Sequence, residues 1–172
     1  MQRYRDGDTR AFDRLYDRYR GPLYRYIRRL CGDCAEAEEL YQDVWLRMLR
    51  ARDQWDAKQA FSPWLYRIAH NRVIDHWRAK GRAPEQDIEE ESIEAAGLAQ
   101  ELLAHLRDCV QRLLALIGGL PEVQRSAFLL KEEAGLSLAQ IAQVTGSERE
   151  TVKSRLRYAM QRLRRGLEGC DD

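Results

Sequence analysis

The sequence predicts an all-α protein of two small helical domains joined by an acidic linker, with a helix-turn-helix in the C-terminal domain. Apolar residues recur at intervals of three and four along most of the chain, which is the helical period, and no β-pattern of any length appears. The charge falls into blocks: residues 1–83 hold 18 Lys/Arg and 12 Asp/Glu, residues 84–101 hold 7 acids and no base, and residues 102–172 hold 11 bases and 9 acids. We therefore assign residues 1–83 and 102–172 to the two domains and residues 84–101 to the linker.

The first two predicted helices cover residues 8–30 and 33–50. Asp8 and Asp33 stand at their starts and are the residue type that caps a helix N-terminus. Pro22 lies inside the first helix, where proline removes a backbone hydrogen bond, and it predicts a kink or break at that point.

A third helix is predicted at residues 64–80, with Ser62 as its N-cap and Pro63 at the first helical position. Beside its apolar stripe we expect these exposed residues: Tyr66, Arg67, Asn71, Asp75 and Arg78. Aromatic rings mixed with basic and amide side chains are typical of surfaces that bind single-stranded nucleic acid. In the alternative interpretation the tyrosine belongs to the core with Trp64 and Trp77.

Two helices, at residues 98–119 and 122–133, lead into a helix pair at residues 136–165. A glycine turn separates the pair, and Ser147 with Glu150 three residues on predicts a capping box for the second helix. The second helix has one apolar stripe and a basic outer face, which is the form that enters a DNA major groove. The alternative is a helical hairpin whose charged face is merely solvated.

The chain shows no sign of a membrane segment or a metal centre. No apolar run approaches the ~20 residues of a membrane span, and the N-terminus lacks an apolar signal segment, so we expect a cytoplasmic protein without direct membrane insertion and with reduced thiols. Cys31 and Cys34 form a CxxC, but a tetrahedral zinc site needs four ligands, and Cys109 and Cys170 are isolated in sequence. We therefore favour a helix–helix turn over a zinc or redox site, and we predict no metal, cofactor or catalytic residue.

Three stretches together resemble the extracytoplasmic-function (group IV) class of bacterial RNA polymerase sigma factors. They are AFDRLYDRY with AEAEELYQDVWLRMLR, then FSPWLYRIAHNRVIDHWRAKGR, then LPEVQRSAFLLKEEAGLSLAQIAQVTGSERETVKSRLRYAMQRLR. The resemblance covers nearly all of the chain except the acidic linker and the last few residues. It implies a transcription initiation factor that binds core RNA polymerase, recognises −35 and −10 promoter elements and nucleates DNA opening.

The resemblance also implies roles for the second and third helices. The second helix matches the segment that docks on the β′ clamp helices of the polymerase, and its docking set is Gln42, Asp43, Leu46 and Arg47. The third helix matches the segment that reads and opens the −10 element, and its −10 set is Tyr66, Arg67, Asn71, Arg72, Asp75 and Arg78. Within this set, Asn71 stands where the family meets a flipped base, and residues 53–61 would wall that pocket. A surface ion pair between Asp43 and Arg47 that does no more than stabilise the helix remains the alternative for the docking set.

The helix pair matches the reader of the −35 element. Its −35 set is Arg149, Glu150, Lys153, Ser154, Arg155, Arg157 and Arg164. Lys153, Ser154 and Arg157 are the expected base-edge contacts, and the other basic residues are expected to bind phosphates. The chain departs from the family at Glu150, where the pattern usually has glycine; this carboxylate either joins the helix cap or accepts a hydrogen bond from a cytosine amino group.

The implied partners are core RNA polymerase, through its β′ clamp helices and β subunit, and promoter DNA. Members of the class are commonly held inactive by an anti-sigma factor, often a membrane-anchored one. The acidic strip at residues 84–96 would run through the polymerase cleft and mimic nucleic acid by its charge. The competing predictions are a stand-alone DNA-binding regulator and an all-α protein adaptor; an enzyme is disfavoured because no nucleophile–base set or phosphate-binding loop is present.

Overall fold

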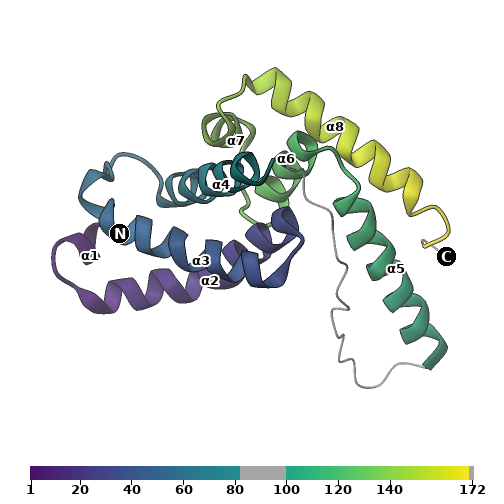
Figure 1. Ribbon diagram of the computed structural model, residues 1–172, viewed down its shortest axis with the longest axis horizontal. Coiled ribbons are helices and arrows are strands. Elements are labelled where there is room, and N and C mark those ends of the chain that lie inside the picture. Colours follow the sequence, from purple (N-terminus) through teal and green to yellow (C-terminus); the bar gives the residue numbers. More distant parts are fainter. Residues whose placement is uncertain (82–99, 171–172) are drawn as a thin grey trace.

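The computed structural model describes residues 1–81 and 100–170, and this part of the chain is helical without strands (Figure 1). The N-terminal half contains α1 (Gln2–Arg5), α2 (Thr9–Cys31), α3 (Cys34–Arg50), the short 3-10 helix η1 (Arg52–Gln54) and α4 (Phe61–Lys80). The C-terminal half contains α5 (Gln100–Gly118), α6 (Glu122–Glu132), α7 (Leu138–Thr145) and α8 (Arg149–Gly166). The predicted all-α class with a helix-turn-helix is therefore confirmed. The predicted linker lies outside the described residues except for its last two residues, which open α5.

The caps predicted for the first two long helices are present. The side chain of Asp8 accepts a hydrogen bond from the backbone N–H of Ala11 at 3.2 Å, and that of Asp33 accepts one from the N–H of Glu36 at 2.9 Å. Each bond satisfies a donor that the first turn of a helix leaves without an intrahelical partner.

Of the kink or break predicted at Pro22, the break does not occur, because α2 continues through this residue to Cys31. Leu23, Tyr26 and Ile27, directly after the proline, have no exposed surface. Their burial outweighs the single hydrogen bond that proline removes.

The predicted start of the third helix is also wrong. α4 begins at Phe61 with Ala60 as its N-cap, so Ser62 lies inside the first turn. The Ser62 hydroxyl is buried without a hydrogen-bond partner among the described residues, and Phe61 packs at 5.8 Å, ring to ring, against Trp64. Phe61 is partly buried in the first turn, three residues before the expected start of the helix at residue 64.

Helices α2, α3 and α4 form the N-terminal bundle, and α5 to α8 form the C-terminal one. In the C-terminal bundle α5 and α8 pack very closely at Gly166, where a Cβ atom would lie 2.3 Å from a methyl carbon of Leu116. Only glycine allows this approach without displacing the leucine.

The two bundles are in direct contact with each other. α4 packs against α7, and α2 packs against α6, so that one continuous apolar cluster includes residues of both halves. In Figure 1 α4 lies beside α7, while α5 and α8 extend away from the N-terminal helices. The helix predicted to read the −10 element therefore lies against the first helix of the helix-turn-helix.

Candidate functional site

The docking set forms an exposed patch on α3 with an apolar centre. Leu46 keeps 49% of its surface exposed, and Gln42 and Arg47 are also exposed. Asp43 is half-buried, and one of its carboxylate oxygens accepts hydrogen bonds from Arg47 at 2.9 Å and from Arg72 of α4 at 2.5 Å. The patch is therefore tied to α4 by a shared ion pair.

The two arginines also change the acidity of Asp43. Burial alone raises the pKa of this carboxyl, but the hydrogen bonds and charges of Arg72 and Arg47 outweigh burial and hold the pKa below its ordinary value of 3.8. Asp43 is consequently ionised at neutral pH. The alternative of an isolated i, i+4 surface pair is too simple, because Arg72 reaches Asp43 from a second helix.

A second group of ion pairs joins α3 to α4 at Glu36, about two helical turns before Asp43 on α3. Glu36 accepts a hydrogen bond from Nε2 of His76 at 2.9 Å and is also paired with Lys80. Together, the ion pairs at Asp43 and at Glu36 hold α4 in a fixed position along α3.

The −10 set is divided between exposed and buried positions on α4. Arg67, Asn71, Asp75 and Arg78 are exposed, as predicted, and Asp75 lies 3.6 Å from Arg78. Arg72 is half-buried and held by Asp43, so its guanidinium is already engaged by a carboxylate.

Tyr66 was predicted to be an exposed member of the −10 set, and the prediction of its exposure is wrong. It has no exposed surface, and its ring packs edge-on against Tyr26 with the ring centres 5.3 Å apart. Burial raises the pKa of its hydroxyl above the ordinary value of 10. α4 is buried on two sides, against the N-terminal bundle and against α7, so its inward face is wider than one apolar stripe suggests. Trp77 is likewise buried, and the core interpretation is correct for these two residues.

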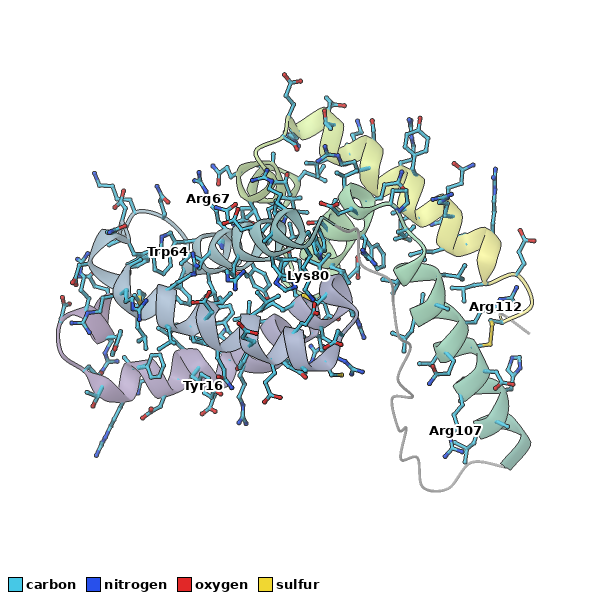
Figure 2. The ribbon with its side chains drawn as sticks, in the orientation of Figure 1. Tyr16, Trp64, Arg67, Lys80, Arg107 and Arg112 are labelled. Atoms are coloured by element: carbon cyan, nitrogen blue, oxygen red, sulfur yellow. A yellow bond between two sulfur atoms is a disulfide. The ribbon has the colours of Figure 1, made fainter. Side chains whose placement is uncertain are left out.

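The loop before α4 and the first turns of α4 border a cleft of about 400 Å³ that faces α7. Its wall in the N-terminal half includes Lys58, Trp64 and Arg67, and its wall in the C-terminal half includes Gln140 and Gln143. Trp64 and Arg67 are labelled in Figure 2, where both lie on α4. Aromatic, cationic and amide side chains therefore meet at the edge of the −10 set.

The −35 set lies on α8, mostly in its first three turns. Arg149, Glu150, Lys153, Arg157 and Arg164 are exposed, and Ser154 and Arg155 are half-buried. The guanidinium of Arg157 lies 5.1 Å from the ring centre of its neighbour Tyr158.

The predicted capping box at Ser147 and Glu150 is wrong. Glu148 is the N-cap residue of α8 and its side chain makes no cap hydrogen bond, whereas the capping box of this region belongs to α7, between Ser137 and Gln140. The Ser147 hydroxyl instead accepts a hydrogen bond from Arg155 at 2.7 Å. Glu150 is left exposed, 3.6 Å from Lys153.

Three polar residues at the contact between the two bundles were not predicted from the sequence: His70, Ser126 and Glu133. Nδ1 of His70 lies 3.2 Å from the hydroxyl of Tyr26 and 3.2 Å from that of Ser126, and Glu133 at the end of α6 accepts hydrogen bonds from Arg25 and Arg29 of α2. Burial, together with the charge of Arg155, lowers the pKa of His70 from 6.5 to about 4. Each partner lies more than 40 residues away in the chain, so no local pattern could have identified these pairs.

The expectation of four reduced cysteines is wrong for Cys109 and Cys170. Their Cα atoms are 5.7 Å apart, within the range that a disulfide requires, and the bond joins α5 to the segment after α8 (Figure 2). Cys31 and Cys34 flank the turn between α2 and α3, as favoured from the sequence, and burial raises the pKa of the Cys31 thiol to about 12. Among the described residues, no cluster of His, Cys, Asp or Glu is arranged to hold a metal ion, and no helix is long and apolar enough to cross a membrane.

Both halves of the chain match families of known proteins. Residues 15–83 match the family described as Sigma-70 region 2, and residues 110–163 match the one described as Sigma-70, region 4. The chain is 32% identical to the RNA polymerase sigma-H factor of Pseudomonas aeruginosa over 98% of its own length and 92% of that protein. It is 31% identical to the ECF RNA polymerase sigma factor SigK of Mycobacterium sp. (strain KMS), over 99% and 88% of the two chains.

The fold is also that of a solved sigma factor. The structure of RpoE from Bartonella quintana, solved in complex with the anti-sigma factor NepR, superposes with a TM-score of 0.78 over 93% of this chain and 98% of that one, at 21% identity. The sequence similarities cover the chain almost from end to end and include both sigma regions, which a stand-alone regulator would not need. The chain belongs to the extracytoplasmic-function RNA polymerase sigma factors and directs RNA polymerase to promoters.

Proposed function

We propose that three surfaces divide the work of initiation: the docking set on α3 binds the β′ clamp helices, the −10 set on α4 reads and opens the −10 element, and the −35 set on α8 reads the −35 element. The observation that carries this proposal is the position of Asn71, exposed on α4 and one helical turn from Arg67 at the rim of the cleft. In this proposal residues 1–83 and 102–172 are the two functional domains, and residues 84–101 connect them.

The docking set has the composition of a protein interface. Leu46 is an exposed apolar anchor, and Gln42, Asp43 and Arg47 supply a polar rim around it. Because Asp43 also holds Arg72, the rim is oriented before the polymerase arrives.

DNA opening requires a group that captures an unstacked base. Unstacking costs a few kcal/mol per base step, and a pocket that binds the flipped base offsets that cost without ATP. Asn71 can donate and accept hydrogen bonds to a base edge, and Arg67 and Trp64, about one and two helical turns before it on α4, supply a cation and a stacking surface at the cleft. Tyr66 has no part in this proposal because it is buried.

On α8, Lys153, Ser154 and Arg157 are our proposed base contacts, with Arg149 and Arg164 on phosphates. Arg155 holds Ser147 and so positions the turn of the helix-turn-helix in addition to any phosphate contact. Since Glu150 takes no part in the cap, we propose that it accepts a hydrogen bond from a cytosine amino group.

The protein acts in the cytoplasm, where RNA polymerase works, and has no catalytic chemistry of its own in this proposal. Solved relatives include RpoE in complex with NepR and CnrH in complex with the cytosolic domain of CnrY. We propose an anti-sigma factor as a further partner of this chain.

Run-off transcription from a genomic promoter library, with purified core polymerase in the presence and absence of the protein, tests the proposal. We expect new transcripts that share two upstream motifs, one near −10 and one near −35. An absence of new transcripts, together with failure of the protein to co-purify with core polymerase, would contradict it.

A further inference from the structure

The disulfide between Cys109 and Cys170 plays no part in the function proposed above. It joins α5 to the segment after α8, across 61 positions of the chain that include the whole helix-turn-helix. The cytoplasm, where RNA polymerase works, keeps thiols reduced, and the disulfides that do occur there are usually transient and act in catalysis or redox sensing. A disulfide in a protein without catalytic chemistry therefore points to redox sensing.

The bond fixes the outer part of α5 to the end of α8. Leu116 of α5 packs closely on Gly166 of α8, and Cys109 lies seven residues before Leu116, at a distance of about 10 Å along the helix. Between the bond and the start of the described side chains of α5, residues 104–108 are exposed, so little packing holds this part of the helix. The covalent bond is thus a second point of attachment between α5 and α8 (Figure 2).

The surroundings of Cys109 favour a reactive thiol when the bond is reduced. Nε2 of His105, one helical turn earlier, lies 3.7 Å from Sγ of Cys109, so the imidazole can accept the thiol proton. Arg112, three residues after Cys109, adds a positive charge at a neighbouring exposed position. Cys109 and Cys170 are both half-buried and His105 is exposed, so a small oxidant can reach the pair.

Cys31 in the N-terminal bundle has the opposite environment. It is buried, and burial raises the pKa of its thiol to about 12. Since the thiolate is the nucleophile, Cys31 is unreactive at neutral pH. The chain therefore contains its own internal control for the reactivity of Cys109.

We propose that Cys109 and Cys170 are a peroxide-responsive thiol pair, and that their oxidation to the disulfide strengthens readout of the −35 element by α8. The inference rests on the proposed function, since it assumes that α8 reads this element. The bond holds the end of α8, which carries the proposed phosphate contact Arg164, in a fixed position on α5, and it restricts the unfolded chain.

The reaction uses hydrogen peroxide as the oxidant. The thiolate of Cys109 attacks one peroxide oxygen, the O–O bond breaks, and a sulfenic acid and hydroxide form. The thiolate of Cys170 then attacks the sulfenic sulfur, which forms the S–S bond and releases a second hydroxide. The two hydroxides take up the two thiol protons and leave as water, so the sulfur pair loses two electrons and the peroxide gains them. Glutathione reverses the change by thiol–disulfide exchange.

The first test follows the reaction itself. Reduced protein is treated with hydrogen peroxide, the remaining thiols are alkylated at set times, and each cysteine is counted by mass spectrometry. We expect Cys109 and Cys170 to be oxidised at least about tenfold faster than Cys31, and His105→Gln to slow their oxidation. Glutathione should restore both thiols. Cys34→Ser, a change at the half-buried cysteine of the α2–α3 turn, is the control and should react like the wild type.

The second test compares the two redox forms in transcription, after each form is freed of reagent and added to core polymerase. The oxidised form should need about a fivefold lower concentration for half-maximal run-off transcription. On a template with a scrambled −35 element the two forms should not differ. Cys109→Ser with Cys170→Ser should behave like the reduced wild type whether or not it meets peroxide, and reduction should lower the thermal unfolding midpoint of the wild type by about 10 °C.

Three outcomes would overturn the proposal. Equal oxidation rates for Cys109 and Cys31 would show that the pair has no special reactivity. A bond that glutathione cannot reduce would be a permanent crosslink. Equal half-maximal concentrations for the two redox forms, in a protein that transcribes normally, would separate the bond from −35 readout and leave the proposed function intact. Failure of both forms to support transcription would instead contradict the proposed function.

Discussion

The two helices that we propose to face DNA, α4 and α8, differ in how their basic side chains are engaged by the rest of the protein. On α4, Arg72, His76 and Lys80 are engaged by carboxylates of α3, and His70 lies in the contact between the bundles. On α8, most of the −35 set is exposed to solvent and its two ion-pair or stacking contacts are with neighbours on the same helix.

This difference suggests different tasks. Cations that are already paired with carboxylates interact less with DNA phosphates. We therefore infer that the pairs on α4 serve to hold its exposed groups, mainly Arg67 and Asn71, in fixed positions. Exposed cations release counterions when they bind DNA, so the exposed basic face of α8 suits the attraction and sequence readout that we propose for it. Four experiments can break or sharpen this contrast.

The largest effect on stability should come from the inward face of α4. Unfolded His70 takes up a proton near pH 6.5, whereas the folded protein resists protonation until about pH 4, so the unfolded state binds more protons between these values. The free energy of unfolding should therefore fall as pH decreases from about 6.5 to 4, by at most about 3 kcal/mol. The groups that face His70 are Tyr26 of α2, Ser126 of α6 and Arg155 of α8.

Urea unfolding at a series of pH values would measure this loss. In His70→Gln the dependence between pH 6.5 and 4 should be flatter than in the wild type, and the exposed His105→Gln serves as control. Identical profiles for the wild type and His70→Gln would show that the imidazole is not held neutral.

The next effect concerns readout by α8. Arg157→Ala should reduce discrimination between the preferred −35 sequence and its single-base variants by about 1–3 kcal/mol, because a cation that contacts a base edge is lost. Competition binding of the polymerase complex to a −35 library would measure it. Arg164→Ala should instead weaken all sequences alike and lower the salt slope by about one. If Arg157→Ala weakened binding to all −35 sequences equally, Arg157 would contact a phosphate and not a base edge.

A smaller effect is expected where α3 and α4 share a carboxylate. Asp43→Ala leaves Arg47 and Arg72 without their acceptor and should lower the free energy of unfolding by about 1–2 kcal/mol. Asp75→Ala, which removes only an exposed pair with Arg78, should change it by less than about 0.5 kcal/mol. Equal losses in urea unfolding would mean that the pairing on α4 is no stronger than an ordinary surface pair.

Elements with a local cause were predictable from the sequence. The order of the long helices follows from apolar period, and the caps at Asp8 and Asp33 follow from residue type and position. The capping box at Ser147 failed although its spacing was right, because α8 begins at Arg149 with Glu148 as its N-cap, which leaves Ser147 one residue before the cap position.

The contact between the bundles was not predictable in this way. Tyr66 was expected on the surface because one helical stripe already accounted for the core, but its ring packs against Tyr26 of α2 and has no exposed surface. Glu133 and Ser126 resemble ordinary surface residues of an amphipathic helix, but Glu133 is paired with arginines of α2 and Ser126 contacts His70 of α4. Partners distant in sequence leave no periodic signal in a single chain.

The most direct test of the account is transcription by Asn71→Ala on two templates that differ only at the −10 element, one a full duplex and the other opened in advance by mismatches. If Asn71 captures a flipped base, the variant should bind core polymerase normally and fail on the duplex, yet recover most of its activity on the opened template, where the unstacking cost is already removed. Equal impairment on both templates, or none on either, would contradict the assignment of DNA opening to α4.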